Sequence, residues 1–380
     1  METRRDVLAL ILAGGAGQRL SPLTDERAKP SLPFGAVYRL IDFPLSNCMH
    51  SGITDVWVLQ QHAPHTLSDH LANGRPWDLD RSYGGLKILH PQQGTDESGW
   101  YRGNADALYR NREQIADLAP ETLLVLSADH VYKLDYRDVL DTHRRHGADV
   151  TVVTTRVRRE EAGRFGVVEV DGDGRLTGFE YKPDEPRSDL VTTEVFAYDT
   201  GRLLDLLDEL AADGGGDDDE DSGLGDFGDV LLPRLVADGG AWQHRLEGYW
   251  RDVGTFGSYW RAHMELLEDE PALRLEDAAW PIRTFMPVLT PSRIDGSAEI
   301  RASLIAPGCR IAGRVTRSVL GPGVRIEEGA EVSEAVLLGE ASVGAGARVE
   351  HAIVDAGARV AGGQQVLGEG DEIAVLGASG

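Results

Sequence analysis

Four apolar runs in the first two thirds of the chain have the length and composition of buried β-strands. They cover residues 7–13 (VLALILA), 55–60 (DVWVLQ), 123–128 (LLVLSA) and 149–155 (DVTVVTT). Continuous apolar runs, rather than alternating ones, are typical of strands that are covered on both faces. Polar or helix-like stretches separate the runs, so the region from Asp6 to about Met264 is predicted to form an α/β domain with a Rossmann-like, mostly parallel sheet.

A different period begins near Ile294. Aliphatic residues there recur at every sixth position, with Gly, Ala, Pro and Glu between them, as in GPGVRI and GAGARV. The recurring residues are Leu320, Ile326, Val332, Val343, Val349, Val354, Val360 and Val366. This period is the signature of a left-handed parallel β-helix, in which each aliphatic side chain points into a prism-shaped core. An ordinary small β-domain is the alternative.

These patterns divide the 380 residues into three predicted parts. Residues 1–266 form the α/β domain, residues 267–291 form a connector that contains AWPIRTF, and residues 292–380 form the β-helix. The run AADGGGDDDEDSGLGD at 211–226 is predicted to be a solvated loop, because like charges repel one another. Mimicry of nucleic acid is the alternative interpretation of this run.

The composition narrows the possible partners. A net charge of -25 excludes a general attraction to nucleic acid or to anionic lipid, so phosphate binding depends on local groups. No N-terminal run is long enough for a membrane span, and VLALILA lacks the cleavage flank of a signal peptide. Cys48 and Cys309 provide no disulfide framework, which favours the reducing cytoplasm.

Lysine is rare in this chain. Only four of the 38 basic residues are lysines, namely Lys29, Lys87, Lys133 and Lys182. Where arginine is used almost everywhere, a lysine indicates a position that needs a compact ammonium group.

The segment LILAGGAGQRLSPLTDERAKP places three glycines directly after the first strand. Gly14, Gly15 and Gly17 allow positive φ and a close approach of the backbone, so that successive N–H groups can face an anion. The spacing is neither that of a dinucleotide-binding GxGxxG nor that of a P-loop. Arg19 and Lys29 follow as two cations for a polyphosphate. A tight turn is the structural alternative.

Two acidic residues are candidates for a metal site. Asp129 follows the strand at 123–128, at the edge where open α/β sheets bind ligands. Asp252 lies in YWRDVGT. A divalent ion between two carboxylates reduces the repulsion between phosphate-bearing substrates. Either aspartate could instead be a turn or cap residue.

The motifs occur in an order that resembles the sugar-nucleotide pyrophosphorylases and, among these, the bacterial glucose-1-phosphate adenylyltransferases (ADP-glucose pyrophosphorylases). After the glycine-rich segment come FGAVYRLIDFPLSNCMHSGI, GWYRGNADAL, SADHVYKLDY, DFGDVLLP, YWRDVGTFGSYW and WPIRTF. The hexapeptide region is also a feature of that family. The resemblance implies that residues 1–266 are a nucleotidyltransferase domain, which makes ADP-glucose for glycogen or other α-glucan synthesis.

The resemblance also implies the chemistry and the roles of single residues. An oxygen of a sugar 1-phosphate attacks the α-phosphorus of ATP in line, and pyrophosphate leaves without a covalent intermediate. Mg²⁺ is held by Asp129 and Asp252, while Arg19 and Lys29 grip the leaving phosphates. Arg19, Lys29 and Asp129 are the predicted catalytic residues. The predicted substrate-binding residues are Gly14, Gly15, Gly17, Gln61, Tyr101, Gly103, Lys182 and Glu194, with Tyr101 and Gly103 at the base and Lys182 at the sugar phosphate.

Several positions depart from the family pattern. Tyr181 replaces the acid of a Glu-Lys-Pro motif, and Glu194 stands where the family has a glycine against the sugar. Glu194 either replaces the lost acid or pairs with the ammonium of another sugar, such as glucosamine 1-phosphate. Val37 replaces a lysine that binds a sugar bisphosphate in activated members, so little activation by fructose 1,6-bisphosphate is predicted. Gln18, in place of Thr or Ser, should have little effect.

Two other functions stay open at this point. The chain could be a catalytically weak regulatory subunit, or a bifunctional enzyme whose β-helix transfers acyl groups, for which His351 is the one placed histidine. Lys133 is predicted either to support Asp129 or to contact a ligand. The exposed edges of a β-helix favour assembly, and the resemblance implies a homotetramer.

Overall fold

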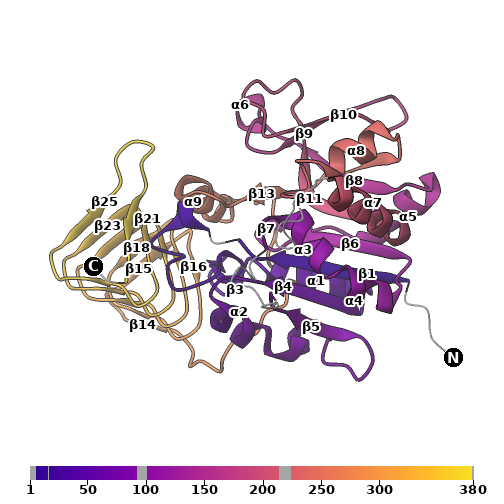
Figure 1. Ribbon diagram of the computed structural model, residues 1–380. Coiled ribbons are helices and arrows are strands. Elements are labelled where there is room, and N and C mark those ends of the chain that lie inside the picture. Colours follow the sequence, from indigo (N-terminus) through magenta and orange to yellow (C-terminus); the bar gives the residue numbers. More distant parts are fainter. Residues whose placement is uncertain (1–5, 16, 92–100, 214–223, 379–380) are drawn as a thin grey trace.

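The structure is a computed structural model that describes residues 6–15, 17–91, 101–213 and 224–378 (Figure 1). An α/β region ends with helix α9 (Phe256–Glu265), and a β-helix begins with strand β14 (Arg293–Ile294). Most of the acidic run predicted as a solvated loop lies outside the described residues. Within the described ranges, no helix is long and apolar enough to cross a membrane.

The centre of the α/β region is a nine-stranded mixed sheet. In sheet order its strands are β10 (Leu176–Tyr181), β9 (Gly166–Val170), β11 (Leu190–Asp199), β6 (Thr122–Ser127), β1 (Val7–Ala13), β4 (Asp55–Gln60) and β5 (Gly85–Leu89), with β8 (Val150–Arg156) beside β11 and β12 (Ala241–Arg245) beside β8. The four predicted strands are confirmed as β1, β4, β6 and β8.

Only part of the sheet is parallel. Strands β6, β1, β4 and β5 run parallel, whereas β11 is antiparallel to β6, β8 and β9. Between β8 and β11 the chain forms the short helix α6 (Arg159–Ala162) and the β9–β10 hairpin, and β11 then enters the sheet antiparallel to β8.

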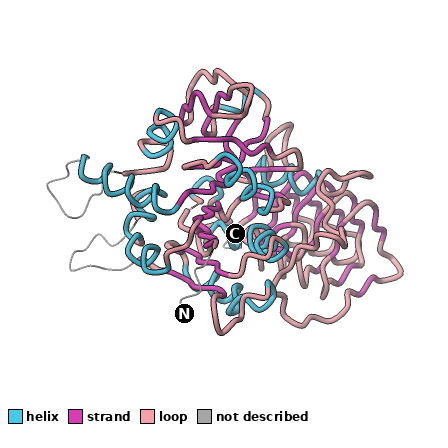
Figure 2. Tube along the Cα trace, turned by 90° about the vertical axis from the view of Figure 1, so that its right-hand side faces the viewer, coloured by secondary structure: helices cyan, strands magenta, loops and turns pink. Residues whose placement is uncertain are grey.

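Helices cover both faces of the sheet, as the apolar strands predict (cyan in Figure 2). Successive side chains of β1 point to opposite faces of the sheet, so Leu8 and Leu10 lie in one buried cluster and Ala9 and Ile11 in the other. The first cluster is covered by α3 (Asn104–Arg110), α4 (Arg112–Leu118), α7 (Thr200–Asp213) and α8 (Leu231–Ala237), and the second by α1 (Asp42–His50), α2 (Pro64–Leu71) and α5 (Tyr136–His146).

Short elements complete the α/β region. Strand β2 (Pro33–Phe34) pairs with β3 (Tyr38–Arg39), and β7 (His130–Tyr132) pairs with β13 (Trp250–Asp252). Within the described ranges, 3₁₀-helices cover Gln18–Leu20, Lys29–Ser31 and Ala72–Trp77.

The C-terminal part forms the predicted β-helix, in which parallel strands place aliphatic residues directly above one another. One inward column contains Ile311, Ile326, Val343 and Val360, and these side chains are buried. Further columns pass through Val332 and Val349 and through Leu337 and Val354. The strands are β14, β15 (Glu299–Arg301), β16 (Leu304–Ile305), β17 (Arg310–Ile311), β18 (Arg314–Thr316), β19 (Val319–Leu320), β20 (Arg325–Ile326), β21 (Glu331–Leu337), β22 (Ser342–Val343), β23 (Arg348–Val354), β24 (Arg359–Val360), β25 (Gln365–Leu367) and β26 (Ala374–Leu376).

The β-helix packs directly on the segment that follows the glycine loop. Leu20 and Leu23 share a buried cluster with Leu338 of the β-helix. Nearby, a guanidinium nitrogen of Arg27 lies 3.1 Å from a carboxylate oxygen of Asp355. Asp355 is buried, with only 3% of its surface exposed. The position of the glycine loop therefore depends partly on the β-helix.

Candidate active site

Two adjoining cavities lie at the carboxyl ends of β1, β4 and β6. We call the first, of about 150 Å³, the carboxylate cavity; its lining includes Lys29, Ser127, Asp129 and Glu194. We call the second, of about 180 Å³, the tyrosine cavity; its lining includes Gln61, Tyr101 and Gly103. Both are also lined by Leu12, Gly14, Gly15 and Asn104. The glycine loop therefore forms a common floor for most of the predicted site residues.

Lys29 lies between the two predicted metal-binding aspartates. Its ammonium nitrogen is 2.7 Å from Oδ2 of Asp129 and 3.5 Å from Oδ1 of Asp252. The lysine is only 6% exposed, although it carries a charge. A buried charge of this kind is stable only with opposite charges beside it, which the two carboxylates supply.

The pKa values reflect this arrangement. Burial alone would raise the pKa of Asp129, but Lys29, with help from His130 and from the hydroxyl of Ser127, holds it well below its usual value. Burial opposes the charge of Lys29 in turn, whereas Asp129 and Asp252 raise the pKa of its ammonium. Asp129 and Lys29 are therefore both charged at neutral pH.

The glycine loop allows Lys29 to approach this closely. Gly17 has a φ of +65°, and a Cβ atom there would lie 3.0 Å from Cβ of Lys29 and from Cγ2 of Thr24. The hydroxyl of Thr24 donates to the carbonyl of Gly17 at 2.9 Å and holds the turn. Gly17 is thus required by both conformation and space.

Strand pairing brings Asp252 to Asp129 from the far end of the domain. In the antiparallel pair of β7 and β13, Asp252 lies opposite His130, which is next to Asp129 in sequence. Helix α9 begins just after Asp252 with a capping box formed by Thr255 and Ser258, which fixes the chain direction. The carboxylate of Asp252 also accepts a hydrogen bond of 2.9 Å from Arg164.

The donor set fits a hard divalent cation such as Mg²⁺. Carboxylate oxygens are the ligands that Mg²⁺ prefers, and Asp129 and Asp252 converge on one point. The ammonium of Lys29 already marks that point as a place where a cation is stabilised. Nδ1 of His130 donates to the carbonyl of Thr193, so its Nε2 faces the aspartates at 3.7 and 3.9 Å.

The tyrosine cavity is built around a reciprocal hydrogen bond. Oε1 of Gln61 accepts from the backbone N–H of Tyr101 at 2.9 Å, and Nε2 of Gln61 donates to the carbonyl of Tyr101 at 3.3 Å. The phenol oxygen of Tyr101 accepts from Asn111 at 3.1 Å. A Cβ atom on Gly103 would lie 2.1 Å from the carbonyl oxygen of Gly225, so only glycine fits there. Trp100, in the same motif, lies outside the described residues.

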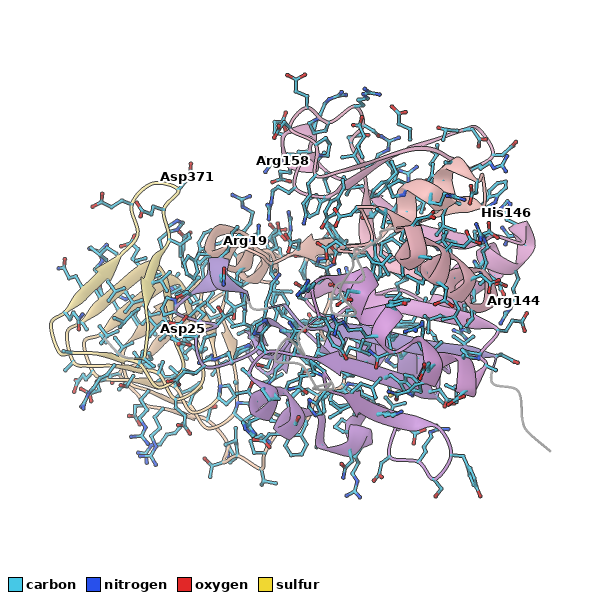
Figure 3. The ribbon with its side chains drawn as sticks, in the orientation of Figure 1. Arg19, Asp25, Arg144, His146, Arg158 and Asp371 are labelled. Atoms are coloured by element: carbon cyan, nitrogen blue, oxygen red, sulfur yellow. The ribbon has the colours of Figure 1, made fainter. Side chains whose placement is uncertain are left out.

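Arg19 and Lys182 lie at the margin of this arrangement. Arg19 is exposed beside α9 (Figure 3), with its Nη2 close to Gly254, two residues beyond Asp252. Lys182 is exposed and donates to the hydroxyl of Tyr181 at 2.7 Å. That hydroxyl donates to Asp226 at 2.9 Å. The tyrosine that replaces the family acid therefore holds the side chain of Lys182.

Glu194 lies inside the carboxylate cavity, where the family pattern has glycine. Its carboxylate, the carboxylate of Asp129 and a ring nitrogen of His130 lie within 4.8 Å of one another. Burial, reinforced by Asp129 and Asp252, raises the pKa of Glu194, although His130 opposes this change. Glu194 therefore lines the same cavity as the Lys29–Asp129 pair, without an ion pair of its own to Lys29 among the described residues.

Sequence reasoning missed three residues of this site. Ser127 and His130 lie on either side of Asp129 within the SADHVYKLDY motif. Both contact the carboxylate of Asp129. Arg164 comes from the loop after α6, and no sequence pattern indicates its bond to Asp252. Lys133 supports the site indirectly, because it bonds the connector at Arg274 and Asp277 and not Asp129.

A larger cavity of about 770 Å³ lies on the other side of Asp252. Its lining includes five arginines, namely Arg156, Arg158, Arg164, Arg251 and Arg261, and only three acids, namely Glu161, Asp252 and Glu265. Arg158 lies at the outer part of the α/β region (Figure 3). Arg158, Arg164 and Arg251 pair with these three acids, so the remaining arginines give the lining a net positive charge in a chain of net charge -25, which favours an anionic ligand.

Comparison with known proteins agrees with the family resemblance of the sequence motifs. The nucleotidyl transferase family model matches residues 8–269, and the model described as GlmU-like, C-terminal hexapeptide matches residues 290–372. A protein named glucose-1-phosphate adenylyltransferase from Thermomicrobium roseum is 44% identical over 369 residues, which is 97% of this chain and 84% of the relative. Proteins of the same name are 44% identical in Thermotoga neapolitana, over 86% of this chain and 76% of the relative, and 40% identical in Clostridium acetobutylicum, over 85% and 84%.

Proposed function

The chain belongs to the glucose-1-phosphate adenylyltransferase family, as its motifs predict, and we propose that it forms ADP-glucose and pyrophosphate from ATP and glucose 1-phosphate with Mg²⁺. One observation carries the proposal: Lys29 meets Asp129 and Asp252 directly above the glycine loop. This juxtaposition supplies both charges that transfer of a nucleotidyl group requires.

In this proposal the two cavities hold ATP. The adenine occupies the tyrosine cavity beside Gln61 and Tyr101, and the phosphates lie over the backbone N–H groups of Gly14 and Gly15. Lys29 leaves the aspartates to bind the leaving pyrophosphate, and Arg19 joins it from beside Gly254. Mg²⁺ bound by Asp129 and Asp252 offsets the repulsion between the two anionic substrates.

The sugar 1-phosphate approaches from the side of Asp252. The arginine-lined cavity attracts its phosphate, and Lys182 binds that phosphate after leaving the hydroxyl of Tyr181. The chain does not need to supply a nucleophile, because an oxygen of the sugar phosphate attacks the α-phosphorus. Positioning and charge stabilisation by these residues then provide the catalysis.

Pyrophosphate release from ATP, Mg²⁺ and glucose 1-phosphate tests the proposal. We expect the parent to turn over and the Asp252→Asn variant to lose about 100-fold or more in kcat, the scale of a lost electrostatic group. Asp208→Asn, which changes an exposed aspartate that pairs with Arg112 and lines neither cavity, is the matched control. No release by the parent would favour the regulatory-subunit alternative, and acyl transfer would favour the bifunctional one.

The sugar is tested in the same assay. The relatives are named for glucose 1-phosphate, but Tyr181 and Glu194 depart from the family pattern. Glucosamine 1-phosphate measured beside glucose 1-phosphate separates the two substrates. A clear preference for glucosamine 1-phosphate would make an amino sugar the substrate of this chain.

Assembly and setting follow from the same premise. The enzyme is proposed to act in the cytoplasm in glycogen or α-glucan synthesis, as a homotetramer assembled through its β-helix. Sedimentation measures the assembly directly, and a monomer at micromolar concentration would refute it. Val37 replaces the lysine that binds a sugar bisphosphate in activated members of the family. The enzyme is therefore proposed to lack strong activation by fructose 1,6-bisphosphate.

A further inference from the structure

Glu194 occupies a backbone conformation that is unfavourable for glutamate. It lies in β11 with a φ of +56°, at a point where the pairing of β11 with β8 shifts between Thr192 and Phe196. Glycine adopts this left-handed conformation without strain, whereas a residue with a Cβ atom does not. A glutamate that persists at such a position in a binding cavity suggests that its side chain has a function.

The bulge directs the carboxylate into the carboxylate cavity. The carbonyl of Thr193 accepts a hydrogen bond of 3.1 Å from His130, and its hydroxyl donates to the carbonyl of Val153 at 3.0 Å. These two bonds fix the backbone just before Glu194. The glutamate then lines the cavity together with Lys29 and Asp129.

A purely structural role does not explain this carboxylate. Among the ion pairs of the described residues, none includes Glu194, and its carboxylate lies within 4.8 Å of a like charge, the carboxylate of Asp129. Two adjacent carboxylates repel one another unless a cation lies between them. When no metal ion or substrate is bound, the ammonium of Lys29 compensates the negative charge of these carboxylates.

We propose that Glu194 is a third carboxylate ligand of the divalent cation, beside Asp129 and Asp252. This inference rests on the proposed function, which places the cation between those two aspartates. Affinity for a divalent cation increases with the number of charged ligands. The chain should therefore bind the cation more tightly than a site with two carboxylates, and before ATP arrives.

The test is a titration of the full chain with Mn²⁺ alone. The electron paramagnetic resonance signal of the free ion measures how much Mn²⁺ stays unbound. We expect Glu194→Gly and Glu194→Gln each to weaken Mn²⁺ binding about ten-fold or more, the lower end of the range for residues that support a metal site. Glu340→Gly is the matched control, because Glu340 also has a positive φ, of +61°, but lies in the β-helix. It should leave Mn²⁺ affinity unchanged.

Stability gives a second readout that does not depend on turnover. Glu194→Gly should raise the urea midpoint of the metal-free protein, because it removes both strain and like-charge repulsion. Excess Mn²⁺ should stabilise the parent more than the variant. Glu194→Gln keeps the strain, so it separates the loss of the charge from the relief of the backbone.

The outcomes distinguish this inference from the proposed function. If Asp129→Asn and Asp252→Asn weaken Mn²⁺ binding but both Glu194 variants bind like the parent, Glu194 is not a ligand and the aspartate site stands. A change only in sugar preference would likewise overturn the inference. If the aspartate variants also bind Mn²⁺ like the parent, the proposed metal site itself fails.

Discussion

Removal of the Lys29 ammonium is the perturbation with the largest calculable effect. The substitution Lys29→Met keeps most of the volume of a side chain that is 6% exposed, but it deletes the charge 2.7 Å from Asp129. Asp129 and Glu194 then lose the nearby ammonium, and Asp252 keeps its bond to Arg164. Breaking a buried ion pair by removing one partner costs about 3–5 kcal/mol.

The cost should depend on pH. In the parent, Lys29 keeps the pKa of Asp129 below its unfolded value, so Asp129 stabilises the fold above pH ~4 and loses this effect as the pH falls. Without Lys29, burial and like charges raise that pKa, so the variant loses stability as the pH rises. The two proteins should therefore differ little near pH 4 and by the full amount at pH 7.

Mg²⁺ should reverse much of the loss, because the carboxylates no longer hold an internal cation. A ligand at 100 times its dissociation constant stabilises the native state by about 2.7 kcal/mol. Urea unfolding at pH 4.5 and 7, with and without Mg²⁺, measures these effects. Lys87→Met is the control, since Lys87 is exposed and bonds Gln114. A Lys29→Met variant as stable as the parent at pH 7, or indifferent to Mg²⁺, would refute this reasoning.

Other predictions concern regions that support the cavities. Burial lowers the pKa of His263 to about 4 from an ordinary 6.5, so about 3 kcal/mol of stability should be lost as the pH falls through that range. Urea midpoints measure this loss, and the His263→Gln variant should lose less stability over the same range. Asp355→Asn leaves Arg27 unpaired, so we expect a loss of about 3 kcal/mol and a higher KM for ATP, with exposed Asp371→Asn unaffected. Gly103→Ala should abolish ATP binding in a calorimetric titration, because its Cβ meets Gly225 at 2.1 Å. Initial rates with saturating fructose 1,6-bisphosphate should change less than two-fold, and a large rise would refute the interpretation of Val37.

Much of the fold could be predicted from local patterns. Apolar runs mark β1, β4, β6 and β8, because a strand covered on both faces has no polar side, and the six-residue period marks the β-helix. The direction of β11 could not be predicted in this way. It depends on a hairpin and a one-turn helix between β8 and β11, and local apolar patterns do not define the direction of entry.

The candidate site was predictable wherever a motif contained its residues. The glycine loop, Lys29 and Asp129 come from contiguous segments, and their cavity confirms that the fold brings them together. Arg164 approaches Asp252 from a loop without a distinctive pattern, so only the fold shows the contact. The bond between Lys182 and Tyr181 likewise depends on the conformation of the chain after β10.

A crystal structure with Mn²⁺ and ATP, using the anomalous signal of manganese, tests the central claim most directly. We expect one manganese peak between the carboxylates of Asp129 and Asp252, with the triphosphate over Gly14 and Gly15. The ammonium of Lys29 should have left the aspartates for the phosphates. Manganese bound elsewhere, or Lys29 still between the aspartates beside a bound triphosphate, would contradict the proposed site.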